Sequence, residues 1–195
     1  MTDEELEQMA ILTIYNYYNG FYKEDYIKEN FLENHILFKK SISRIYIGNE
    51  FCHNLFPQTE LLMNMIKKCA NDNLNITLCF TYMRDNLIEE TKNIIGTVYE
   101  WCIKNGMKIE VVINDWGMIK LLEDKTDYFT LSLGVLLNKR KKDPRYIYKK
   151  GYEKNKDIMS ENNLNSKIFS DFLKENKIER YEYENCGYEI LIGEG

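Results

Sequence analysis

Short apolar runs alternate with amphipathic stretches along most of the chain, and this alternation constrains the fold more than any other feature. The runs rich in β-branched and aromatic residues, which predict strands, lie at 44–48, 76–82, 109–113, 128–133 and 178–183. The stretches with helical periodicity lie at 58–71, 86–104, 118–123 and 165–176. The first three runs begin about 32 residues apart, which is the size of one βα unit. The sequence therefore predicts an α/β fold of repeated βα units with mostly parallel strands.

Two of these runs are almost continuously apolar, as expected for parallel strands whose two faces are both covered. Right-handed βα units can curl into a partial or complete TIM-like (β/α) barrel, and the alternative is a doubly wound open sheet. A complete barrel typically needs about 250 residues. The chain has 195 residues and five predicted strands, so we expect a shortened barrel or one that another chain completes.

The length and composition predict a single domain. A 44% share of hydrophobic residues is enough for a packed core in 195 residues. We expect N-terminal helices within residues 1–43, where Thr2 and Glu5 match a capping box, the βα repeats at 44–185, and a tail at 186–195.

The N-terminus and the cysteines both indicate a cytoplasmic protein. Residues 1–5 are acidic where a secretory signal would be basic, and no apolar run approaches the roughly 18 residues of a membrane span. The chain has five cysteines and no Cys-x-x-Cys pair, which argues against a disulfide framework and a closed zinc site. We therefore expect free thiols and no membrane partner.

Polar residues follow the predicted strands, and parallel βα folds place their functional groups at these carboxyl ends. The residues that we expect to form a polar pocket are Glu50, Arg84, Asn114, Asp115 and Asn138. Asp115 is the acid–base candidate and Arg84 an anion-orienting group, while Asn114 and Asn138 would position substrate by hydrogen bonds. Trp116 adds an aromatic ring to the same turn. The ordinary alternative is that these Asn and Asp side chains cap the helices that follow.

Two segments resemble one known family. The sequence Val-Val-Ile-Asn-Asp-Trp-Gly at 111–117 and the sequence Leu-Gly-Val-Leu-Leu-Asn at 133–138, with Asp-Pro-Arg at 143–145, resemble the U32 peptidase-like family. This resemblance implies a (β/α) barrel-type fold. It also implies an activity on a peptide, as in collagenase-like peptidases, or on an RNA or quinone-like substrate, as in hydroxylation-associated members.

The chain departs from the hydroxylation-associated members, which carry a four-cysteine iron–sulfur cluster. Only Cys186 lies after residue 102, so this chain alone cannot supply such a cluster. Five strands also leave unpaired sheet edges, which proteins pair, cover or blunt. Three arrangements remain open: a barrel capped by its own N-terminal helices, one half of a split protein completed by a second polypeptide, or a homodimer.

Residues 139–150 form a basic segment with seven Lys or Arg side chains and one Asp, interleaved with two tyrosines. It is either a solvated loop or a contact for an anion or RNA backbone, with Arg140 and Arg145 as substrate-binding candidates. Near the first strand, a nucleophilic pair of Cys52 and His53 is conceivable, as is a metal site from Glu50, His53 and Asp115, although the residue spacing supports neither.

The sequence leaves two functional hypotheses. The first is an enzyme, or a subunit of one, of the U32-like type that acts on a peptide, RNA or quinone-like substrate. The second is a non-catalytic accessory protein that uses residues 139–150 to hold an anionic partner, since a fold does not by itself confer a function.

Overall fold

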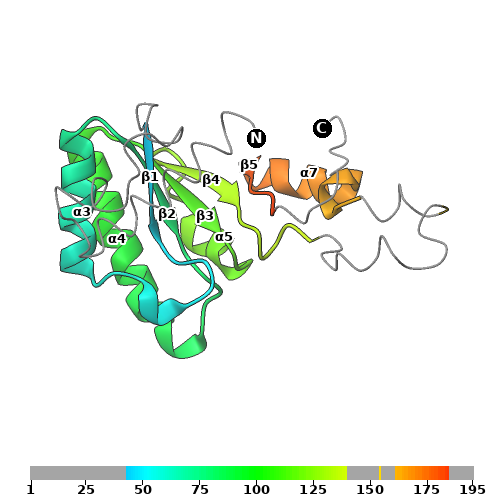
Figure 1. The fold of residues 1–195 in the computed structure, drawn as a ribbon, viewed down its shortest axis with the longest axis horizontal. Helices are drawn as coiled ribbons and strands as arrows, with labels where there is room; N and C mark the ends of the chain where they lie inside the picture. Colours follow the sequence, from blue (N-terminus) through cyan, green and yellow to red (C-terminus); the bar gives the residue numbers. More distant parts are fainter. Residues whose placement is uncertain (1–42, 140–153, 155–160, 185–195) are drawn as a thin grey trace, which may run out of the picture.

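The computed structural model describes residues 43–139, 154 and 161–184, and its centre is a five-stranded, all-parallel sheet (Figure 1). The strands are β1 (Arg44–Gly48), β2 (Asn75–Cys79), β3 (Ile109–Ile113), β4 (Phe129–Leu133) and β5 (Ile178–Tyr181). All five strands that the sequence predicts are therefore confirmed. The predictions at 76–82 and 178–183 ran past the ends of β2 and β5, because apolar and aromatic residues continue into the loops.

Helical segments separate the strands, as the periodicity predicts. They are η4 (His53–Leu55), α3 (Thr59–Asn71), η5 (Asp85–Leu87), α4 (Ile88–Asn105), α5 (Gly117–Leu122), η8 (Asn163–Asn165) and α7 (Lys167–Glu175). The helix α4 ends at Gly106, whose φ of 62° is the left-handed conformation that glycine adopts without strain. The predicted N-terminal helices and most of the basic segment lie outside the described residues.

The order of the strands in the sheet is the order in which they occur in the chain, β1-β2-β3-β4-β5. A doubly wound sheet contains a point at which this order reverses. The described strands contain no such reversal, so successive βα units are wound in one direction.

One face of the sheet is apolar and carries the helices. Alternate residues of the strands, such as Ile47, Leu78 and Val111, form one hydrophobic cluster with buried side chains of α3, α4, α5 and α7. Figure 1 shows α3 and α4 along the same side of the strands. Burial of this shared apolar surface is the main stabilising contribution to the fold.

The opposite face of the sheet is polar. The strand register places Thr77 and Glu110 side by side, and Tyr46 lies beside Thr77. Thr77 and Glu110 are buried although both are polar, and Ser132 of β4 is buried as well. The sheet therefore carries helices on one face and buried polar groups on the other.

Within the described part of the chain, none of the helices combines the length and the apolar character that crossing a membrane requires. The cysteines Cys52, Cys69, Cys79 and Cys102 are all free thiols, which confirms the prediction for these four residues. Cys186 lies outside the described residues.

Candidate functional site

The turn after β1 directs Glu50 over the carboxyl edge of the sheet. Gly48 has a φ of 127°, and a Cβ atom there would lie 2.1 Å from the Cys79 carbonyl oxygen, so only glycine fits. The side chain of Asn49 accepts hydrogen bonds from the backbone N–H groups of Phe51 (2.9 Å) and Cys52 (2.7 Å). This turn fixes the backbone on both sides of Glu50.

Asn114 connects three loops at the same edge. Its Nδ2 donates to the Phe80 carbonyl at 2.9 Å and lies 3.5 Å from Glu50 Oε1, while its Oδ1 accepts from the Leu136 N–H at 3.0 Å. Asn114 is 3% exposed, so these hydrogen bonds are shielded from water. A Cβ atom at Gly134 would lie 2.1 Å from Asn114 Oδ1, which explains the glycine in this loop.

Glu182 enters the site from the end of β5. Its backbone N–H donates to the Leu133 carbonyl at 2.8 Å, and its carbonyl accepts from Asn138 Nδ2 at 2.7 Å. Asn138 is buried at the end of the loop after β4. The backbone of Glu182 is therefore held on both sides, and its side chain extends over the polar face.

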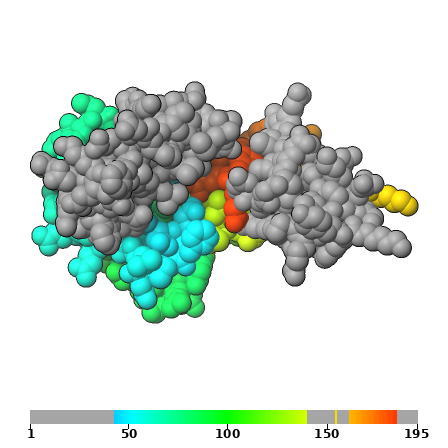
Figure 2. All heavy atoms as spheres, in the orientation of Figure 1, coloured from blue at the N-terminus to red at the C-terminus, as the bar shows by residue number. Residues whose placement is uncertain are grey.

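The carboxyl groups of Glu50 and Glu182 meet next to the thiol of Cys79, with one ligand atom of each residue within 4.8 Å of the others. Figure 2 shows the end of β5, in orange-red, beside the segment that follows β1, in cyan. β1 and β5 are the first and last strands of the sheet, and in a flat sheet they would lie roughly 19 Å apart at about 4.8 Å per strand. The sheet is therefore strongly curved around its polar face.

Burial raises the pKa of Glu182 to about 10, and the hydrogen bond and negative charge of Glu50 add to the effect, with Glu110 as a smaller cause. The N–H of Val135 acts in the opposite direction. Two carboxyl groups in contact cannot both ionise cheaply, so the one proton of the pair stays on Glu182. The pKa of the Cys79 thiol is also raised, first by burial and then by the charges of Glu182 and Glu50.

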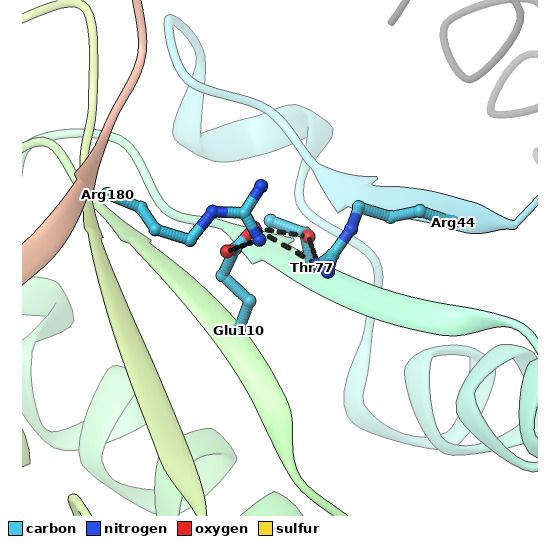
Figure 3. Close-up of polar contacts among 4 residues, drawn as sticks. All are labelled: Arg44, Thr77, Glu110 and Arg180. Carbon is cyan, nitrogen blue, oxygen red and sulfur yellow. Dashed lines mark hydrogen bonds and ion pairs between the residues drawn. The ribbon is translucent and has the colours of Figure 1, made fainter. Parts of the chain in front are cut away.

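The polar face of the sheet also carries a charged cluster, which consists of Arg44, Thr77, Glu110 and Arg180. Figure 3 shows the two arginines reaching Glu110 from opposite sides. Arg44 Nη1 lies 3.2 Å from Glu110 Oε1, and Arg180 Nη1 lies 2.6 Å from Oε2. Thr77 Oγ1 donates to the same Oε1 at 2.7 Å. The arginines neutralise a carboxylate that is only 4% exposed, as buried charges require.

The structure brings together three of the residues that the sequence singled out. Glu50 and Asn114 are in contact, and Asn138 holds the backbone of Glu182. Asp115 instead accepts from two backbone groups, Gly117 N–H at 2.7 Å at the start of α5 and Met83 N–H at 3.2 Å. A catalytic role for Asp115 remains a prediction.

The other predicted residues lie away from this cluster or outside the described part of the chain. Arg84 is exposed at the start of η5. Trp116 is 40% exposed and packs edge-on against Phe169 and Phe172 of α7, with ring centroids 5.9 and 5.4 Å away. Arg140 and Arg145 lie outside the described residues. Among the described residues, the proposed combination of Glu50, His53 and Asp115 is not one of the groups close enough to share a metal ion.

Sequence reasoning missed Glu182 and Cys79. Glu182 fell inside the predicted strand 178–183, and β5 ends one residue before it. Cys79 looked like an ordinary buried thiol. The available signal was the alternation along β2, because Cys79 shares its face with Thr77 rather than with Ile76 and Leu78.

Glu50 and Glu182 form a carboxyl pair that can hold, donate and accept a proton. Asn114 and Asn138 keep the two side chains at the sheet edge, and the curvature of the sheet brings them together. Comparison of the chain with known protein families, with curated proteins and with solved structures found no match.

Proposed function

We propose that the protein is a U32 peptidase-like enzyme of the (β/α) barrel type, and that Glu50 and Glu182 form its general acid–base pair. The convergence of these two carboxyl groups at the carboxyl edge of a curved, singly wound sheet is the observation that carries the proposal. A substrate over this edge would meet both side chains at once.

The proton held by Glu182 fits the requirements of peptide hydrolysis. One carboxyl group must take a proton from the attacking water, and a second must give a proton to the leaving amine. Two carboxyl groups that share one proton perform both steps in aspartic proteases. Here Glu182 is the proton donor, because its pKa of about 10 keeps it protonated at neutral pH, and Glu50 is the acceptor.

Peptides are the preferred substrate class, because cleavage of an amide bond needs a general acid and a general base together. The resemblance to the U32 family also implies RNA or quinone-like substrates, which remain second choices. Closure of the barrel by a second polypeptide or a second copy of the chain is part of the same proposal. The mass of the protein in solution tests that closure separately.

The test is cleavage of a panel of quenched fluorescent peptides by the full chain, with Glu50→Gln and Glu182→Gln as variants. We expect each variant to lose about 10²- to 10⁴-fold in rate, the usual contribution of one general acid or base. Glu179→Gln is the matched control, because Glu179 is an exposed carboxylate on the same strand.

Cleavage that survives Glu182→Gln would contradict the proposed roles. A folded protein that cleaves no peptide and binds RNA through residues 139–150 would support the accessory function instead. Loss of RNA binding on substitution of Arg140 and Arg145 would identify that segment as the contact.

A further inference from the structure

We propose that Glu50, Cys79 and Glu182 bind one divalent transition-metal ion of the zinc class. The three side chains come from the ends of β1, β2 and β5, and their ligand atoms lie within 4.8 Å of one another. Ligands of one tetrahedral Zn²⁺ ion lie about 2.0–2.3 Å from it, so two of them are roughly 3.3–3.8 Å apart. Small side-chain movements bring all three within range.

The position of Cys79 is an independent observation in favour of a ligand. Cys69 and Cys102, the two other buried cysteines among the described residues, belong to the apolar core cluster, whereas Cys79 does not. Cys79 is 5% exposed and faces the polar side of the sheet, and within residues 43–139 and 161–184 its sulfur forms no hydrogen bond. A buried thiol beside two carboxyl groups gains little from packing and much from a metal ion.

One of the three proposed ligand residues, Glu182, has a buried side-chain oxygen without a hydrogen-bond partner among the described residues. Glu182 Oε2 is fully buried and has no hydrogen-bond partner among the described residues. Leaving a buried polar atom unpaired costs about 1–3 kcal/mol. A metal ion between Glu50 and Glu182 would satisfy this oxygen and would also remove the repulsion between the two carboxylates.

The ligand set selects the class of metal. A thiolate is a soft ligand, whereas Mg²⁺ and Ca²⁺ are bound by oxygen atoms alone. Two carboxylates and one thiolate suit Zn²⁺, for which Co²⁺ is a spectroscopic substitute. Three protein ligands leave one tetrahedral position for water or substrate, which is typical of catalytic rather than structural zinc sites.

Binding must release protons, because a metal ligand has to be deprotonated. Cys79 would bind as the thiolate, and Glu50 and Glu182 as carboxylates. A protein that holds the ion has no proton on Glu182 to donate, so the metal site and the acid–base pair are alternative states of the same residues. The inference rests on the residues of the proposed acid–base function, but it is tested without any substrate.

The experiment is a Co²⁺ titration of the full-length reduced protein after removal of metal with a chelator. We expect one equivalent of Co²⁺ to bind, with a thiolate-to-cobalt charge-transfer band. Cys79→Ser should abolish the band, and Glu182→Gln should weaken binding at least about tenfold. Cys102→Ala is the matched control, because Cys102 lies in the apolar core on α4.

The absence of saturable binding, or a band that persists in Cys79→Ser, would overturn the metal site. Circular dichroism of each variant checks that it is folded, and Glu182→Gln retains the shape of the side chain. Peptide cleavage measured in chelator separates the two proposals. If peptide cleavage persists in chelator and depends on Glu50 and Glu182, and if the protein binds no Co²⁺, the metal site is wrong and the acid–base function is retained.

Discussion

The carboxyl groups of Glu50 and Glu182 meet although the two residues follow the first and the last strand of the sheet. Their contact requires a curved sheet, and the raised pKa of Glu182 follows in part from that contact. The pair therefore links the shape of the sheet to the chemistry at its edge.

We predict that Glu50→Gln lowers the pKa of Glu182 from its value of about 10. The neutral amide removes the negative charge of Glu50, while the effect of burial remains, so the pKa should stay above its ordinary value. Carboxyl ¹³C NMR titration of labelled protein measures this shift. An unchanged pKa would mean that burial alone is responsible and that the charge of Glu50 has no effect.

The stability of the protein should fall as the pH rises from about 5 to about 10. In this range the folded state keeps the proton of Glu182, whose pKa is raised to about 10, whereas the unfolded chain has lost it. Glu182→Gln stays neutral and should show a flatter profile, measured as urea unfolding midpoints across the range. The exposed Glu179→Gln should follow the unsubstituted protein, and an equal slope in Glu182→Gln would count against the raised pKa.

Gly134→Ala should destabilise the fold by about 1–3 kcal/mol, because the added Cβ would lie 2.1 Å from Asn114 Oδ1 in a packed site. Gly96→Ala in the middle of α4 is the control, since no atom lies within 4 Å of its added Cβ. That control should gain roughly 0.5–1 kcal/mol from helix propensity. Urea unfolding measures both changes, and a neutral Gly134→Ala would show that the loop can move away from Asn114.

Glu110→Ala should cost about 3–5 kcal/mol, the usual effect of removing one partner from a buried ion pair. Arg44 and Thr77 would both lose their contact with the carboxylate. Arg180→Ala should cost less, because Arg180 is 46% exposed and water can replace part of its interaction. Equal losses in the two variants, measured by urea unfolding, would show that solvent does not screen the Arg180 contact.

The βα repeat and the approximate positions of all five strands can be predicted from the sequence alone, because hydrophobic periodicity and turn residues are local signals. The sequence also indicates Glu50, Asn114 and Asn138, which lie in loops that follow strands. Strand order, curvature and the partner of each side chain depend on contacts between distant segments. No local pattern reports that Glu182 reaches Glu50, or that Cys79 faces them rather than the apolar core. Which polar residues of the sheet edge form a site depends on the folded chain, because curvature brings Glu50 and Glu182 into contact and burial raises the pKa of Glu182.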